Sequence, residues 1–272
     1  MDQIHKRSSN EWYKNDDFPY ITDIVKEMLG VAIHELLYVR KLYPMEVFES
    51  CRYLGIEVHA ARHPTLSNYI DHMLDVSVPA LCDGGADALY FVIMEGDGEE
   101  VDGVVVERYT FEFDVDHVHE QNERGEMHIF DGSVNDEDRR QAILVGIEKS
   151  FRNFILKIIS LEANQYLDHR RRSEYNSHRR KEEACSEMRS SRTFKLCLRK
   201  CSQMLSQKNS DSVKLLEDFI TNGSWKISNG NHYAFPKSSN GCRTPLKDIH
   251  VPSCGIHMNL ALDYLPEDAI SY

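Results

Sequence analysis

The chain has 272 residues, of which 41% are hydrophobic, and a formal net charge of −12. This length can bury a sizeable core, and we expect one domain. The acidic balance argues against direct binding of nucleic acid, because such binding depends on Lys and Arg that neutralise phosphates. No apolar run reaches about 18 residues and residues 1–10 have no signal-peptide core, so we expect an intracellular protein without membrane contact.

Two helices are predicted in the first third of the chain, after a flexible N-terminus of residues 1–18. Apolar residues recur at helical spacing between residues 20 and 42, and Pro44 ends or kinks this helix. A second stripe begins at Pro64, which suits the first turn of a helix, and closes near Cys82.

The apolar pattern then changes to that of strands. Residues 88–94 and 104–113 predict two strands, joined by the acidic, glycine-rich residues 95–103. This link lacks the alternating oxygen ligands and the final glutamate of a calcium-binding EF-hand loop, which favours a plain hairpin loop.

The most regular apolar stripe lies in residues 138–161 and predicts one long amphipathic helix. Acidic residues 136–138 follow Asn135 and suit a helix start, because they face the positive end of the helix dipole. Such a stripe requires a sheet or a helix to cover it.

Residues 164–192 are polar and basic and are predicted to be a disordered insertion. This segment has two basic clusters, 170–172 and 179–181. They fit either a plain solvated loop or a bipartite nuclear-import signal. Strand alternation returns at 193–198 and 256–262. The order of elements predicts an α+β fold, with three main helices packed on a largely antiparallel sheet.

Three short motifs occur in order in the first part of the chain: LYVRKLYP at 37–44, HPTLSNYI at 63–70 and FILKI at 154–158. They resemble the HORMA-domain family, and within it most closely the non-catalytic small subunits of DNA polymerase zeta. Further matches at Thr193-Phe194, Trp225, 245–247 and 258–260 extend the resemblance, which implies a HORMA domain over residues 19–266 and a C-terminal end at 267–272.

The resemblance implies an adaptor without a catalytic centre, a metal or a cofactor. Such domains bind a short extended peptide as an added strand, and a C-terminal "safety belt" of strands and a connecting loop closes over it. The expected partner is a proline-containing peptide of the catalytic subunit of DNA polymerase zeta. The expected role is translesion DNA synthesis and the DNA damage response, in the nucleus, with the cytoplasm left open as a second location.

The resemblance also assigns roles to single residues. Tyr69, Trp225 and Ile227 match positions that line the peptide groove, although Tyr69 and Trp225 would otherwise be taken as core residues. Arg152 matches an arginine of a self-association surface. It could therefore contact a second copy of this chain or another HORMA protein, or it could simply lie on a solvated helix face.

A second partner face in the family recruits a scaffold translesion polymerase through a leucine, a glutamine and a tyrosine. The corresponding positions here are Arg243, Asn259 and Ala261. These departures put that recruitment in doubt or imply a changed partner.

Two other classes of function remain as alternatives. One is a spindle-checkpoint, meiotic or autophagy HORMA protein that binds a different peptide. The other is a metal-dependent enzyme or a zinc site built from a loop with acidic and histidine side chains or from a cysteine pair. Their members are Asp114, Asp116, His117, His119, His128, Cys197 and Cys201. This spacing matches no zinc motif, and we expect no metal.

Overall fold

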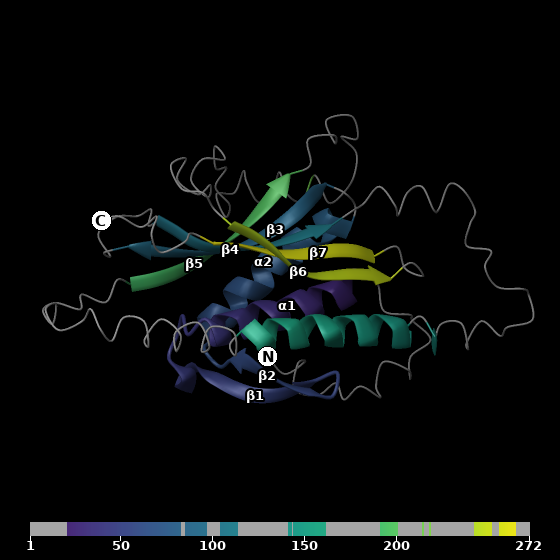
Figure 1. Cartoon of the computed structure of the whole chain (residues 1–272), viewed down its shortest axis with the longest axis horizontal. Coiled ribbons are helices and arrows are strands. Elements are labelled where there is room, and N and C mark those ends of the chain that lie inside the picture. The colour runs from purple at the N-terminus through teal and green to yellow at the C-terminus, as the bar shows by residue number, and fades with distance from the viewer. Residues whose placement is uncertain are drawn as a thin grey trace, which may run out of the picture.

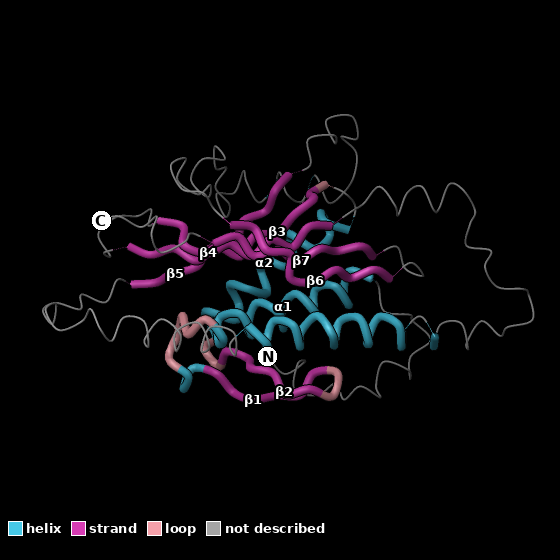
Figure 2. The backbone as a smooth tube through the Cα atoms, viewed as in Figure 1, coloured by secondary structure: helices cyan, strands magenta, loops and turns pink. Residues whose placement is uncertain are grey.

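The structure is a computed structural model that describes residues 21–82, 85–96, 104–113, 141–142, 144–161, 191–200, 214, 218, 242–251 and 256–264. These residues form three layers, shown in Figure 1 and Figure 2. A five-stranded sheet is one outer layer, the helices form the middle layer, and a two-stranded hairpin is the other outer layer. Every described strand pair is antiparallel, which confirms the predicted α+β fold.

The helices lie where the apolar periodicity placed them. They are α1 (Ile21–Val39), the short 3-10 helix η1 (Met45–Val47), α2 (Pro64–Cys82) and the helical residues 141–142 and 144–161. None of the described helices is long and apolar enough to cross a membrane. The predicted start of the third helix, at residues 138–140, lies outside the described residues.

The described residues form seven strands. They are β1 (Phe48–Tyr53), β2 (Ile56–Ala61), β3 (Ala86–Gly96), β4 (Val104–Phe113), β5 (Ser191–Lys200), β6 (Cys242–Val251) and β7 (Ile256–Tyr264). The large sheet has the order β5-β3-β4-β7-β6, and the small one pairs β1 with β2. The strands β5 and β6 therefore form the two edges of the large sheet.

Most of helix α1 is buried, because it lies between the sheet and the hairpin (Figure 1). Its buried apolar residues are Ile24, Val25, Met28, Leu29, Ala32, Ile33, Leu36, Leu37 and Val39. Even polar His34 and Glu35 are only 5% and 1% exposed. A single apolar stripe facing one layer would not account for this burial.

The third helix, residues 144–161, buries the predicted stripe. Its buried members are Leu144, Ile147, Phe151, Phe154, Ile155, Ile158 and Leu161. The ring of Phe154 lies 6.1 Å from that of Phe111 on β4, so the sheet provides part of the cover. On another side, Nη1 of Arg152 donates a hydrogen bond of 2.9 Å to the carbonyl of Leu54 in the β1–β2 turn.

The polar groups of α1 fasten it to the hairpin. The carboxylate of Glu35 accepts a hydrogen bond of 2.8 Å from the backbone N–H of His59 on β2. His34 Nδ1 accepts one of 3.3 Å from the backbone N–H of Ala61. The ring of His59 also stacks on Tyr38, with centroids 3.4 Å apart. These contacts satisfy backbone donors on the edge of a two-stranded sheet.

At the C-terminal end of α1, Arg40 fastens the helix to the large sheet. Its Nε lies 3.0 Å from the Glu107 carboxylate and also donates to the hydroxyl of Tyr109, both on β4. That hydroxyl donates to Glu107 at 3.0 Å, and burial beside Glu107 raises the pKa of Tyr109 well above its usual value. Arg40 Nη1 is buried without a hydrogen-bond partner.

Two strands, β1 and β6, were not predicted as such from the sequence. The β1–β2 turn has a positive φ at both Leu54 (47°) and Gly55 (75°), a conformation that Asn-Gly usually signals and Leu does not. Strand β6 contains Pro245, which argues against a strand; here β6 is an edge strand and its register shifts next to Pro245.

We expect His34 to make stability depend on pH. Burial lowers its pKa from 6.5 to about 4, so below pH 6.5 the unfolded chain takes up a proton that the folded chain does not. The free energy of unfolding should therefore fall as the pH drops from 6.5 towards 4, by about 3 kcal/mol in all. Unfolding by urea at several pH values measures this.

The matched variant is His34→Asn, whose side-chain oxygen can accept from Ala61 N–H but takes up no proton. Its unfolding free energy should change less between pH 6.5 and 4 than that of the wild type. An equal loss of unfolding free energy in both proteins would show that His34 does not cause the pH dependence.

Candidate functional site

The outer edge of β5 is the main candidate site. Strand β5 pairs with β3 on one side, and no described strand covers its other side. On that side the backbone N–H of Leu196 donates to the hydroxyl of Tyr69 on α2, at 3.5 Å. In an antiparallel ladder, neighbouring residues turn their N–H and C=O groups to opposite sides, so Phe194 and Leu198 also direct theirs outwards.

Three aromatic side chains gather beside this edge. Tyr69 and Tyr43 both meet the ring of Phe194 edge-on, with centroids 5.8 and 6.3 Å away. Tyr69 is 40% exposed and Tyr43 is 37% exposed, so part of each ring faces solvent. We call Tyr43, Tyr69 and Phe194 the aromatic trio.

The core holds the aromatic trio in place. Phe194 stacks on Phe91 of β3 at 5.3 Å, and Phe91 meets Tyr109 at 6.0 Å. Partial burial raises the pKa of the Tyr69 hydroxyl further above neutral, and like any tyrosine it is protonated at pH 7 and can donate a hydrogen bond. The trio therefore offers preformed aromatic surface next to a strand edge along which no described strand lies.

Of the residues expected in a peptide groove, the structure places Tyr69 at the β5 edge, while Trp225 and Ile227 lie outside the described residues. Two further residues of the site, Tyr43 and Phe194, had no role assigned from the sequence. Their signal was present, because both belong to the short motifs that carry the family resemblance.

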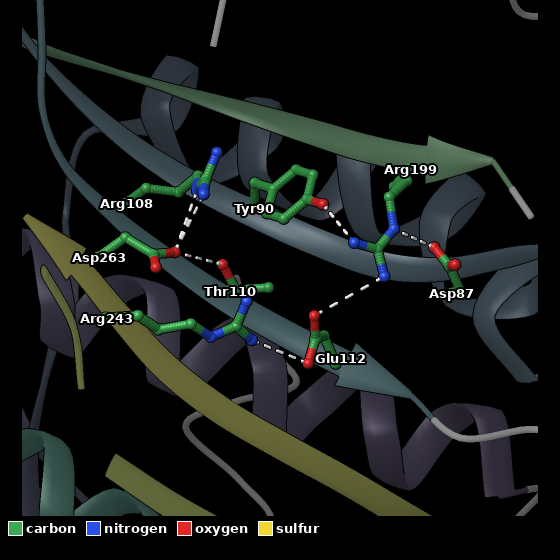
Figure 3. Close-up of polar contacts among 8 residues, drawn as sticks. All are labelled: Asp87, Tyr90, Arg108, Thr110, Glu112, Arg199, Arg243 and Asp263. Carbon is green, nitrogen blue, oxygen red and sulfur yellow. Dashed lines mark hydrogen bonds and ion pairs between the residues drawn. The ribbon is translucent and has the colours of Figure 1, made fainter. Parts of the chain in front are cut away.

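The opposite end of the sheet carries the C-terminal hairpin, whose strand β7 pairs with β4. On the sheet face turned away from the helices, Asp263 is 5% exposed. Its carboxylate accepts hydrogen bonds from Arg108 at 3.1 and 3.2 Å and from the hydroxyl of Thr110 at 3.3 Å (Figure 3). Both partners belong to β4, so this buried contact joins the hairpin to β4.

The same face carries a chain of more exposed ion pairs (Figure 3). Arg243 on β6 lies 2.9 Å from Glu112 on β4, and Glu112 lies 3.7 Å from Arg199 on β5. Arg199 also donates to Asp87 at 2.6 Å and to Tyr90 at 2.9 Å. We call these pairs, with the Asp263 contacts, the outer-face network; it spans all five strands.

The three residues predicted for a second partner face lie in this part of the sheet. Arg243 is exposed and engaged with Glu112. Asn259 and Ala261 lie on β7, where Ala261 is only 4% exposed and pairs with Thr110. Of the three, Arg243 is exposed, Asn259 is half-buried and Ala261 is buried, so a partner could reach the first two.

No group of three His, Cys, Asp or Glu side chains in the described ranges could hold a metal ion. The acidic and histidine-rich loop that suggested a metal site lies outside those ranges, as does Cys201. The described geometry presents a strand edge beside aromatic surface.

Comparison with known proteins matches a model of the HORMA domain to residues 22–215, more than half of the chain. The chain belongs to the HORMA-domain family. In this HORMA domain, the candidate edge β5 and the Tyr69 helix α2 both fall within the matched region.

Several relatives carry names that describe checkpoint or polymerase proteins. The HORMA domain is 28% identical over 149 residues to the mitotic spindle assembly checkpoint protein MAD2B of Rattus norvegicus, covering 55% of this chain and 59% of the relative. It is 35% identical over 92 residues to MAD2B of Danio rerio (34% and 41% covered). The DNA polymerase zeta processivity subunit of Schizosaccharomyces pombe is 34% identical over 92 residues (34% and 41%). The matches thus span 41–59% of these relatives' lengths.

Solved structures share the fold. A chain of the mitotic checkpoint complex has a TM-score of 0.55 at 15% identity, covering 90% of this chain and 98% of that one. C. elegans HTP-2 bound to HTP-3 closure motif 1 has a TM-score of 0.52 at 12% identity, covering 89% and 85%. These likenesses confirm the HORMA fold predicted from the sequence motifs.

The outer-face network yields a prediction about the C-terminal hairpin. Replacing Asp263 by Asn removes the carboxylate charge that faces the guanidinium of Arg108, which is 23% exposed, and should cost about 2 kcal/mol of unfolding free energy. Chemical denaturation measures the loss.

The matched control is Arg243→Gln in the same network. The Arg243–Glu112 pair is 50% and 31% exposed, so its loss should cost less than about 1 kcal/mol. Equal losses in the two variants would contradict a special role for the buried contact.

Proposed function

We propose that this HORMA domain is a non-catalytic adaptor that captures a proline-containing peptide at the outer edge of β5. The observation that carries the proposal is the Leu196 N–H, which points away from β3 and meets only the Tyr69 hydroxyl among the described groups. A row of outward backbone donors and acceptors is a template for an added strand.

The aromatic trio would supply the side-chain contacts. Proline packs well on flat rings and loses little entropy on binding, because its backbone is already restricted. The exposed parts of Tyr43 and Tyr69 flank Phe194 directly beside the edge. An added strand could therefore form backbone hydrogen bonds to β5 while a proline rests on the trio.

For the partner, we propose the catalytic subunit of DNA polymerase zeta, with a role in translesion DNA synthesis and the DNA damage response in the nucleus. The motifs at 37–44 and 63–70 support this choice, and so does the likeness to a relative named as a subunit of that polymerase. Other relatives are named spindle checkpoint proteins, which keeps a checkpoint HORMA protein as the alternative.

We propose that Trp225 and Ile227, in the chain between β5 and β6, belong to a safety belt that closes over the peptide. Strands β6 and β7 pair on the β4 side of the sheet and so leave the β5 edge available. A belt that must open before release slows dissociation of the peptide.

Two further surfaces are proposed on the basis of the family resemblance. Arg152 would lie in a self-association surface for a homodimer or a heterodimer, on a helix face that also exposes Val145 (50%) and Leu156 (41%). Contact with a scaffold translesion polymerase would use Arg243 and Asn259, because Ala261 is buried.

The experiment is affinity capture from nuclear extract with the wild type, Tyr69→Ala and Tyr69→Phe. We expect the wild type to retain the polymerase zeta catalytic subunit and Tyr69→Ala to lose it, because deleting a central aromatic contact costs about 2 kcal/mol. Tyr69→Phe should retain it, since the ring remains and the Leu196 N–H becomes available to the peptide.

Circular dichroism should show that all three proteins are folded. Absence of the polymerase subunit from every capture would contradict the partner assignment, and capture of a checkpoint protein in its place would support the alternative. If Tyr69→Ala retained the polymerase subunit as well as the wild type does, the aromatic trio would not be part of the site.

A further inference from the structure

We infer that Arg40 binds a carboxylate of residues 265–272, the segment that follows β7, at the corner of the sheet where α1 ends. This inference does not rest on the proposed function. It follows from a buried donor of Arg40, from the place where the chain leaves β7 and from the charges around that place.

The guanidinium of Arg40 has one more donor group than its known contacts use. Only 6% of its side chain is exposed, and its Nε faces the Glu107 carboxylate at 3.0 Å and donates to the Tyr109 hydroxyl. Its Nη1 is buried and has no acceptor within the described part of the chain. Buried donors nearly always have an acceptor, because an unsatisfied charged donor is costly. Arg40 Nη1 is therefore a site for an acceptor oxygen.

The end of β7 lies next to this donor. Tyr264, the last residue of β7, is directly opposite Glu107 on β4 and is 38% exposed. Neighbouring strands are about 5 Å apart, and an extended chain advances about 3.3 Å per residue. The first three residues after Tyr264 can therefore reach Arg40.

A strand added at the outer edge of β5 is too far away to supply the acceptor. The sheet order β5-β3-β4 puts that strand three strand spacings, or about 15 Å, from β4. The acceptor of Arg40 and the peptide of the proposed function are thus separate questions.

Positive charge gathers where α1 ends. Lys41 directly follows Arg40, and its φ of 52° lies in the left-handed region, so the chain turns sharply there. The Lys41 N–H donates to the Tyr38 carbonyl at 3.0 Å, which fixes this turn. The two cations lie at a corner where Glu107 supplies one negative charge beside Arg40. A second carboxylate would balance the charges.

The segment after β7 carries suitable carboxylates. Residues 265–272 read LPEDAISY, with the acidic residues Glu267 and Asp268 and no Lys or Arg. By contrast, residues 232–241, which lead into β6, contain no Asp or Glu. Charge and reach therefore both favour the chain that leaves β7 over the chain that enters β6.

One guanidinium can serve both carboxylates, because its five N–H donors point in different directions. Glu107 faces Nε, and the second carboxylate would accept from Nη1. This contact would fasten the end of β7 to α1 on the helix face of the sheet. The Asp263 contacts already fasten β7 to β4 on the opposite face, so the C-terminal hairpin would be held from both sides.

The test measures hydrogen exchange of the arginine guanidinium protons by NMR, on the full chain with isotope-labelled arginine. Arg40→Lys assigns the Arg40 signals, and the test variant combines Glu267→Gln with Asp268→Asn. The matched control combines Glu100→Gln with Asp102→Asn. These two residues belong to the acidic segment 97–103, which joins β4 at the same end of the sheet, and the charge change is equal.

We expect the Arg40 Nη protons to exchange slowly in the wild type and at least about tenfold faster in the test variant, with no change in the control. Circular dichroism should show that all the proteins are folded. Slow exchange in both variants would mean that another group is the acceptor, and faster exchange in the control alone would assign it to segment 97–103. Wild-type exchange as fast as that of exposed Arg243 would show that Nη1 has no protein acceptor. Each of these three results would overturn the inference.

Discussion

Burial of α1 between two layers is the constraint on which the rest of the fold depends. A helix that buries residues on opposite faces needs a neighbour on both, and here the sheet covers one face and the β1–β2 hairpin the other. Burying apolar side chains of this size contributes roughly 1.5–3 kcal/mol each before the loss of conformational entropy. The polar anchors Glu35 and Arg40 then fix how each layer is placed.

The position of α1 explains why a binding site can form at β5. Tyr43 follows the end of α1 and reaches Phe194, while α2 brings Tyr69 to the same ring. At the other side of the sheet, the buried Asp263 contacts hold the C-terminal hairpin on β4. One side of the sheet is thus occupied by the chain's own C-terminal strands, and the other ends at β5, beside aromatic surface and with no further strand among the described residues.

Helix periodicity gave the most accurate prediction. The stripe at 144–161 and the start of α2 at Pro64 agree with the structure, because apolar spacing follows directly from helix geometry. Strand β1 was missed because its turn has Leu54 at a positive φ, and no local sequence pattern signals such a turn. Strand β6 was missed because it contains a proline, which an edge strand tolerates and a central strand does not. Strand order, which decides whether a given strand becomes an edge, depends on contacts far apart in sequence.

The candidate site was predictable only in part, for the same reason. Tyr69 was found through a motif, but its contact with Leu196 joins residues 127 positions apart. Both α1 and the helix at 144–161 contact the sheet and the hairpin, a shared placement that their apolar spacing alone does not indicate. The sequence motifs indicate the family, and the packing of α1, α2 and β5 indicates where a peptide can bind.

The most direct test of strand addition is backbone amide hydrogen exchange, measured by NMR with and without a captured peptide. The account predicts slower exchange on peptide binding for the outward amides of Phe194, Leu196 and Leu198, with little change for Lys195 and Cys197, whose amides face β3. Peptide binding that left the exchange of all five amides unchanged would contradict it.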